Sequence, residues 1–190
     1  MPHLIIDLDH TLLDTTRFKA DLAKSVDLTQ ADWDMAYNKF VADYGMFNAT
    51  DFLKGVTAEQ KKQFEMVVQK TSSFLYPDSL SFLKRAVQAG YQIIVLTFGN
   101  QTWQQQKLDH ITWPPGVTVL TTDSKKITQL AQYRGGDTLV VDDRGQELDA
   151  IAQSWSNVKL YWMRRPNGKY RDVAPVAPHR EITSLSEVTL

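Results

Sequence analysis

One stretch near the N-terminus decides the fold of this chain: Leu4-Ile5-Ile6-Asp7-Leu8-Asp9-His10-Thr11-Leu12-Leu13-Asp14. Its three leading apolar residues predict a buried strand that opens directly onto two aspartates spaced i, i+2. In an open α/β sheet, ligands bind at the edge where the strands end. Two carboxylates at that edge repel each other and need a cation, a shared proton or a substrate beside them. An aspartate-rich loop that caps a helix is the alternative interpretation.

The composition is that of a globular protein with one α/β domain, or one domain with a modest insertion. The chain has 190 residues, 43% of them hydrophobic and 11% aromatic, which is ample for a core. A net charge of −1 argues against a nucleic-acid surface, and the lack of cysteine excludes disulfides and thiolate chemistry. No apolar stretch approaches the ~20 residues that span a bilayer, and the N-terminus lacks the features of a signal peptide. We therefore expect a cytoplasmic protein with no nucleic-acid or membrane partner.

Residues 15–76 are predicted to form an all-helical insert. The apolar residues from Phe18 to Val26 recur every four positions, as on one face of a helix. Thr29 begins a second amphipathic pattern that Gly45 ends, and Thr57-Ala58-Glu59-Gln60 is a capping-box signal before a third. Strand-like alternation is missing from this segment.

From Pro77 onward, helical and strand patterns alternate. Further strands are predicted at residues 91–97, 117–120, 138–141 and 158–162. A helix capped by Ser124 is expected to run through Tyr133 and to be closed by Gly135-Gly136. Such alternation predicts an α/β fold: a doubly wound, Rossmann-like, mostly parallel sheet of about five strands. Residues 1–14 and 77–190 would form the core domain, into which residues 15–76 are inserted.

Polar residues stand where three of the predicted strands end. They are Asp7 and Asp9, then Thr97, then Asp142 and Asp143. Because the carboxyl ends of parallel strands share one edge of a sheet, these side chains should converge. Several carboxylates without a neutralising partner would be costly, and a hard, oxygen-liganded cation such as Mg²⁺ resolves the repulsion.

Two lysines, Lys125 and Lys126, lie at the predicted start of a helix and bring positive charge to the same region. Carboxylates, a cation, a hydroxyl and a lysine together suit a phosphoryl group. One carboxylate can attack phosphorus, while a second protonates the leaving alcohol and then deprotonates water. Each feature alone has a structural explanation, as a helix cap or a solvated face, but their joint occurrence favours a site.

These residues, in this order, resemble the motifs of the haloacid dehalogenase (HAD) superfamily of aspartate-nucleophile phosphatases. Asp7-Leu8-Asp9-His10-Thr11 is similar to the first motif, Asp-x-Asp-x-Thr, and the apolar run Ile93 to Thr97 is similar to the second. Lys125 or Lys126 stands for the third, and Val140-Val141-Asp142-Asp143 for the fourth. The resemblance covers essentially the whole chain.

The resemblance implies a role for each motif residue. Asp7 would be the nucleophile that forms an aspartyl-phosphate, and Asp9 the general acid/base. Thr97 and a lysine would hold the phosphoryl oxygens, and Lys126 is preferred over Lys125 because family motifs often place this lysine second in such a pair. The resemblance also implies a Mg²⁺ cofactor. Its ligands would be Asp7, the carbonyl of Asp9, Asp142 and Asp143, with Glu147 in a supporting position.

The helical insert corresponds to the type I cap of this superfamily, which closes over the site and excludes water. The chain departs from the family pattern at His10, where a small residue is common, at Phe98-Gly99-Asn100, and in the short spacing from the lysine to Asp142. The candidate substrate contacts are His10, Arg17, Phe98 and Asn100. Lys19, Tyr44, Asn48 and Lys54 are further candidates in the cap, with a solvated or core position as the alternative.

The activity we expect is Mg²⁺-dependent hydrolysis of a small phosphorylated metabolite, a phosphomonoester. A phosphomutase would use the same residues, and a catalytically silent phosphometabolite-binding module would keep the same scaffold. Asp9 argues against a dehalogenase or phosphonate hydrolase, because an acid/base at this position serves an alcohol leaving group. A receiver domain is disfavoured because its acidic pair comes first in the chain. The five tryptophans suit a core or a subunit interface equally, so the oligomeric state stays open.

Overall fold

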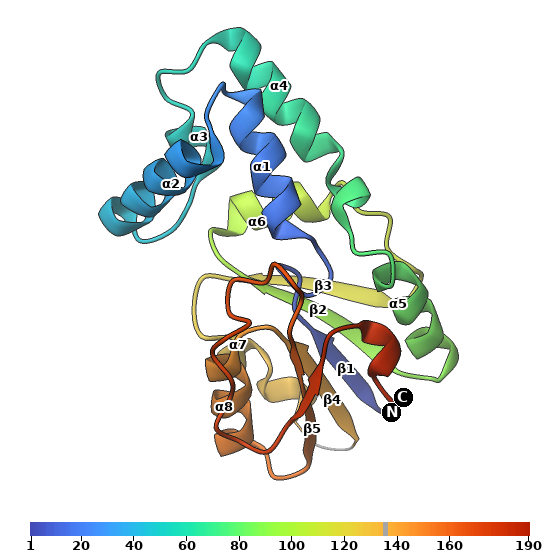
Figure 1. Ribbon diagram of the computed structural model, residues 1–190. Helices are drawn as coiled ribbons and strands as arrows, with labels where there is room; N and C mark the ends of the chain where they lie inside the picture. The colour runs from blue at the N-terminus through green and yellow to red at the C-terminus, as the bar shows by residue number, and fades with distance from the viewer. Residues whose placement is uncertain (135–136) are drawn as a thin grey trace.

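The computed structural model describes residues 1–134 and 137–190, which form a parallel sheet with a helical segment above one of its edges (Figure 1). The sheet has six strands in the order β3-β2-β1-β4-β5-β6, and every pairing is parallel. The strands are β1 (His3–Ile6), β2 (Gln92–Phe98), β3 (Val117–Thr122), β4 (Thr138–Asp142), β5 (Val158–Met163) and β6 (Arg180–Ile182). The predicted doubly wound α/β fold is confirmed, with six strands where about five were expected. The extra strand, β6, has only three residues, too few to show a periodic pattern.

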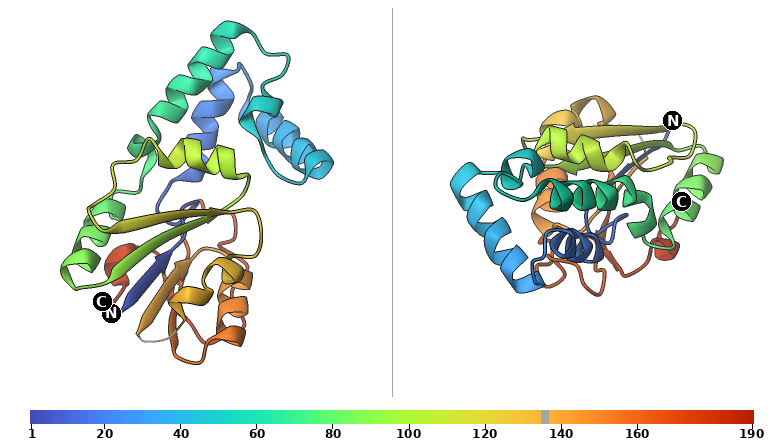
Figure 2. Two further views of the ribbon diagram at one scale, coloured as in Figure 1. Left: turned by 180° about the vertical axis from the view of Figure 1, so that it is seen from behind. Right: turned by 90° about the horizontal axis from the view of Figure 1, so that it is seen from above.

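Helices cover both faces of the sheet (Figure 2). Leu4 and Ile6 of β1 point into a core that includes residues of α5 (Ser79–Gln88) and α6 (Gln101–Leu108). Ile5, between them, points to the opposite face, where α7 (Lys126–Gln129) and α8 (Gly145–Ser154) lie. The short 3-10 turns are η1 (Thr71–Phe74), η2 (Ala131–Tyr133) and η3 (Leu185–Glu187). Among the described residues, no helix is both long enough and apolar enough to cross a membrane.

The helix predicted from Ser124 to Tyr133 is wrong in extent. α7 has four residues, starts after Lys125 without a side-chain cap, and gives way to the 3-10 turn η2. Lys125 stands at the N-cap position instead of Ser124, and the Ser124 hydroxyl lies 3.1 Å from the hydroxyl of Thr122 and 3.4 Å from that of Thr128. The predicted stop at Gly135-Gly136 lies outside the described residues. The consequence for the site is that Lys126 occupies the first position of a very short helix.

Of the five α-helices between β1 and β2 in the chain, the first four stand above the carboxyl edge of the sheet (Figure 1). They are α1 (Thr15–Ser25), α2 (Gln30–Tyr44), α3 (Ala49–Phe52) and α4 (Ala58–Gln69). The side chain of Thr29 caps α2, Gly45 ends it with a φ of +81°, and Thr57 and Gln60 form the reciprocal capping box of α4. We call residues 15–76 the cap, following the prediction from the sequence.

The two chain segments that connect the cap to the core are hydrogen-bonded to each other. The Asp14 amide donates to the carbonyl of Phe74 over 2.8 Å, and the Tyr76 amide donates to the carbonyl of Leu12 over 2.9 Å. Between these bonds, Leu13 and Leu75 form an antiparallel bridge. The cap is therefore joined to the sheet by a two-stranded ribbon, which fixes where it starts and ends without fixing its tilt.

Aromatic packing forms the second connection between cap and core. Trp103 of α6 reaches up into the cap, with its ring centroid 5.3 Å from that of Phe47, 5.9 Å from Phe64 and 6.2 Å from Phe18. Such aromatic pairs prefer edge-to-face or offset geometry at these separations. The lower side of the cap thereby lies directly over the edge at which the strands end.

Candidate active site

Three buried carboxylates meet where β1 and β4 end. Asp7 directly follows β1, and its amide donates to the carbonyl of Val141 over 3.0 Å, which sets it beside Asp142 at the end of β4. Asp143 is the next residue. One carboxylate oxygen of each of the three lies within 4.8 Å of the other two. These strands are the pair at which the sheet order reverses, the place where ligands bind in doubly wound sheets.

Lys126 enters this cluster from α7. Its ammonium group donates to Asp7 and, over 2.7 Å, to Asp142, and its side chain is 3% exposed. Lys125, by contrast, is exposed to solvent. The structure thus places Lys126 rather than Lys125 beside the carboxylates.

One ammonium does not balance three carboxylates. Burial raises the pKa of Asp7 and that of Asp143; repulsion from neighbouring carboxylates raises both further, and Lys126 opposes the shift. Asp143 also has a buried oxygen, Oδ2, that lacks a hydrogen-bond partner within the described part of the chain. A hard divalent cation would take such an oxygen as a ligand and neutralise the excess charge. Asp7, Asp142 and Asp143 therefore fit a bound cation.

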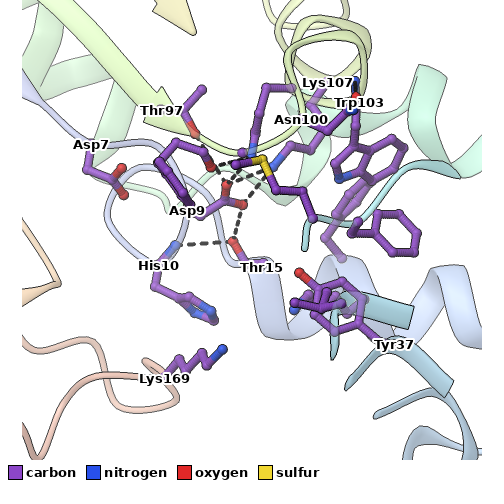
Figure 3. A pocket seen from close by; sticks show the side chains of 18 of the residues that line it. Asp7, Asp9, His10, Thr15, Tyr37, Thr97, Asn100, Trp103, Lys107 and Lys169 are labelled. Carbon is purple, nitrogen blue, oxygen red and sulfur yellow. Dashed lines mark hydrogen bonds and ion pairs between the residues drawn. The ribbon is translucent and has the colours of Figure 1, made fainter. Parts of the chain in front are cut away.

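The carboxylate of Asp9 is separate from this cluster and is held by other partners (Figure 3). The Lys107 ammonium lies 2.8 Å from each of its oxygens, and the Thr15 hydroxyl donates over 2.8 Å. The Thr97 hydroxyl adds a longer contact of 3.4 Å. Burial alone would raise the pKa of Asp9, but Lys107 and Thr15 hold it well below its usual range. Asp9 is consequently ionised in this arrangement.

His10 follows Asp9 in a left-handed backbone conformation, with a φ of +59°. This conformation turns the chain sharply, so that the His10 amide donates to the carbonyl of Leu13 and to the Thr15 hydroxyl. The imidazole is 7% exposed, and its Nδ1 has no hydrogen-bond partner among the described residues. Figure 3 shows the ring pointing toward Lys169.

A cavity of about 280 Å³ connects the carboxylates to the cap. Asp7, Asp9 and Asp143 lie at one end of it. The cap contributes mostly apolar and aromatic side chains to its wall, among them Phe18, Trp33, Tyr37 and Phe47. A small molecule with a charged end and an apolar end would fit such a space.

Comparisons with known proteins agree with this geometry. The family model for haloacid dehalogenase-like hydrolases matches residues 1–154. This chain belongs to that family. No curated protein shows significant similarity to the HAD-like hydrolase described here.

Solved structures share the fold of this HAD-like hydrolase at low sequence identity. A haloacid dehalogenase-like hydrolase from Burkholderia xenovorans is 18% identical, with a TM-score of 0.70 over 97% of this chain and 93% of that one. The HAD hydrolase YfnB from Bacillus subtilis is 15% identical, with a TM-score of 0.61 over 98% of this chain and 96% of that one. The L-2-haloacid dehalogenase PA0810 has the same identity, TM-score and coverage as YfnB.

Several other residues singled out from the sequence also lie in the pocket of the HAD-like hydrolase. Thr97 is fully buried at its floor, and Phe98 and Asn100 line it. The Asn100 side chain accepts a hydrogen bond from the Trp103 amide and so caps α6. Glu147 lies near Arg144, 3.5 Å from its guanidinium, and is not a member of the carboxylate cluster.

The structure does not bring Arg17 to the pocket, contrary to the expectation of a substrate contact. Its guanidinium donates to the carbonyl of Ser73 and lies 5.0 Å from the centroid of the Phe74 ring, at the cap connection. Three further candidates from the cap also do not line the pocket. Tyr44 is 72% exposed, Asn48 caps α3, and Lys54 pairs with Asp51 over 2.7 Å.

No functional role is predicted for Lys107 from the sequence, although its position on a helix indicates one. It shares one buried face of α6 with Trp103, Gln104 and Leu108, and a lysine on a buried helix face requires an anionic partner. No comparable signal marks Lys169, which reaches the pocket from the irregular segment between β5 and β6.

Proposed function

We propose that this HAD-like hydrolase cleaves a small phosphorylated metabolite, a phosphomonoester, with the help of Mg²⁺. The observation that carries the proposal is the carboxylate of Asp9, which lies in the same pocket as Asp7 and is held by Lys107 and Thr15. An alcohol leaving group needs a proton as its bond to phosphorus breaks, whereas a halide leaves without one. A second carboxylate beside the nucleophile therefore favours phosphate ester chemistry.

The reaction proceeds in two steps at Asp7. In the first, an Asp7 oxygen attacks phosphorus, the bond from phosphorus to the ester oxygen breaks, and the alcohol leaves with a proton from Asp9. In the second, Asp9 takes a proton from water, which attacks phosphorus, releasing phosphate and regenerating the Asp7 carboxylate. Because Asp9 is ionised before the reaction, the proton that it passes to the alcohol comes from the Lys107 ammonium, which lies 2.8 Å from both of its oxygens, and the proton taken from water in the second step returns through Asp9 to Lys107.

Lys126 and a bound cation would neutralise the charge at the site. Mg²⁺ held by Asp7, Asp142 and Asp143 would neutralise the phosphoryl oxygens and polarise phosphorus. Lys126 and Thr97 would hold the phosphoryl oxygens, and their position in the pocket lining, beside Asp7 and Asp9 respectively, supports this role. YfnB, of similar fold, was solved bound to magnesium, which supports the choice of Mg²⁺.

The test is phosphate release from an aryl phosphate and from a panel of phosphorylated metabolites. We expect turnover with Mg²⁺, loss of turnover in EDTA, and loss in Asp7→Asn. Asp9→Asn should retain the fold and lose roughly 10²- to 10⁴-fold in turnover, the usual contribution of a general acid/base. Turnover that survives EDTA or Asp7→Asn contradicts the proposal.

Product analysis separates the alternatives. A phosphomutase would return an isomeric phosphate ester instead of free phosphate, and a silent binding module would bind members of the panel without turning any over. Since the PA0810 structure is that of an L-2-haloacid dehalogenase, chloride release from L-2-chloropropionate is measured in parallel. Chloride release without phosphate release would overturn the proposal.

A further inference from the structure

Two cations in the pocket have no role in the proposed chemistry. Lys19 of α1 and Lys169, from the segment between β5 and β6, both line the cavity. Lys107 and Lys126 are paired with carboxylates, but Lys19 and Lys169 form no ion pair within the part of the chain that the structure describes. Two ammonium groups without a carboxylate partner among the described residues therefore flank the space beyond the catalytic carboxylates. Lys19 is half-buried, and Lys169 is exposed and lies 5.3 Å from the centroid of the Tyr170 ring.

The surroundings of Lys19 make this arrangement costly in the absence of an anion. Its ammonium lies 4.0 Å from the centroid of the Tyr37 ring, which orients it, and the side chain is half-buried. Burial lowers the pKa of Lys19 to about 8, with repulsion from Lys169 and Lys107 acting in the same direction and Asp9 opposing it. A ligand anion between Lys19 and Lys169 would relieve both the desolvation and the repulsion.

Two buried polar groups in the same cavity also lack partners. His10 Nδ1 and Trp33 Nε1 make no hydrogen bond within the described residues, although the two side chains are only 7% and 1% exposed. Both residues line the cavity, and Figure 3 shows His10 and Lys169 pointing toward each other across it. Because both nitrogen atoms are fully enclosed by protein atoms, a ligand would reach them only after a side chain moves, whereas Lys19 and Lys169 line the cavity directly.

The remaining wall sets the size and shape of that ligand. Tyr37, Phe47 and Trp103 present aromatic surfaces, which suit a flat apolar body. At about 280 Å³, the cavity is slightly smaller than the roughly 300–1,000 Å³ that is usual for ligand pockets. It therefore holds a phosphoryl group and a leaving group of about one ring.

We propose that the leaving group of the substrate carries an anionic group, a carboxylate or a second phosphate, which Lys19 and Lys169 bind while a small flat body packs against the aromatic wall. The inference rests on the proposed function, because it assumes that the phosphoryl end of the same molecule lies at Asp7. It adds a substrate class: small phosphomonoesters with a second negative charge.

The test compares three benzyl phosphates that differ only in the para substituent. They are para-(phosphonooxymethyl)benzoate, its neutral carboxamide, and para-xylylene bisphosphate. We expect kcat/KM to be about tenfold higher for at least one anionic ester than for the carboxamide, as for a hydrogen bond between charged groups. The better of the two anionic esters identifies the group as carboxylate or phosphate.

Variants connect this preference to the two lysines. In the double variant Lys19→Met, Lys169→Met, the ratio of kcat/KM for the anionic ester to kcat/KM for the neutral ester should fall to about one. In Lys19→Arg the ratio should stay high, because the positive charge is kept. Lys24→Met is the matched control, since Lys24 lies on the same helix but is exposed and pairs with Asp21 over 3.1 Å. A ratio near one in the unmodified protein, or a preference that persists in the double variant, overturns the inference.

A binding assay separates this inference from the proposed function. Trp33 and Trp103 line the cavity, so their fluorescence reports ligand binding without turnover. If none of the esters is hydrolysed, the proposed function fails, but tighter binding of the anionic esters that is lost in the double variant still supports the anion site. Equal affinity for the anionic and neutral esters overturns it.

Discussion

His10 holds a backbone conformation that favours glycine, immediately after the proposed acid/base. At a φ of +59°, a side chain costs roughly 1–2 kcal/mol relative to glycine. We expect His10→Gly to be more stable than His10→Ala by about 1 kcal/mol, since both remove the imidazole but only glycine adopts this φ freely. Denaturant unfolding of the two variants measures the difference. If alanine is the more stable of the two, as at an ordinary backbone position, the residue is unstrained.

The two adjacent lysines of α7 provide a matched pair of variants. Lys126→Met should reduce phosphate release by roughly 10²- to 10³-fold, as the loss of one fixed charge at a transition state does, whereas Lys125→Met should stay within about twofold. The reason is position: Lys126 contacts Asp7 and Asp142, and Lys125 is exposed. Circular dichroism in Mg²⁺ controls for folding, because losing Lys126 leaves buried carboxylates unpaired. Equal losses in both variants would contradict the assignment.

Lys19 makes the preference for anionic substrates depend on pH. Its pKa is lowered to about 8, so the charged form prevails below that pH and disappears above it. We expect the ratio of kcat/KM for the anionic ester to that for the carboxamide to fall as pH rises through about 8. The ratio cancels titrations common to both substrates. The charged and titratable groups that face Lys19 include Asp9, His10, Asp34, Tyr37, Lys107 and Lys169. A ratio that is flat from pH 7 to about 9 would contradict this role.

The helix α6 is the element on which both the acid/base and the cap depend. Its Lys107 holds Asp9, and its Trp103 packs against three aromatic rings of the cap. Trp103→Ala should lower the free energy of unfolding by about 3–5 kcal/mol, the usual cost of removing a large buried side chain, and Trp103→Phe by less. Urea unfolding measures both changes. A loss below about 1 kcal/mol in the alanine variant would mean that cap and core do not share this packing.

Elements with local signals were predictable, and those that depend on tertiary contacts were not. Helix ends are marked by residues within one turn of the chain, and the structure has helix ends at the predicted positions: Thr29, Gly45 and the Thr57 capping box. The extent of α7 was not predictable because the Ser124 hydroxyl contacts the side chains of Thr122 and Thr128 and does not cap the helix. β6 exists only because β5 offers it an edge to pair with.

The candidate active site likewise has a part that could be predicted from the sequence and a part that could not. Asp7, Asp9, Thr97, Asp142 and Asp143 could be predicted to converge because they follow strands, and parallel strands end at one edge. Lys19, Lys107 and Lys169 come from a cap helix, a core helix and an irregular segment, and no periodicity relates them. Only the folded arrangement shows that Lys107 neutralises Asp9, while Lys19 and Lys169 form no ion pair with any described residue.

A bound cation should stabilise the whole molecule. Because Asp7, Asp142 and Asp143 repel one another in the folded state and not in the unfolded chain, a cation binds the former preferentially. At a Mg²⁺ concentration about 100 times the Kd, the stabilisation is about 2.7 kcal/mol, which raises the Tm by several degrees. Thermal unfolding with and without Mg²⁺ measures it, and Asp143→Asn should reduce the shift. An unchanged Tm at saturating Mg²⁺ would show that the cluster holds no Mg²⁺.

The ribbon at Leu13 and Leu75 has a consequence for engineering and for evolution. Paired residues of an antiparallel bridge are about 5 Å apart, a gap that a two-residue hairpin turn closes. The chain therefore leaves and re-enters the sheet at nearly one point, and the intervening segment can change in length with little cost in loop-closure entropy. The cap is in this sense an interchangeable cassette, so that specificity can be exchanged by recombination while the catalytic edge stays untouched.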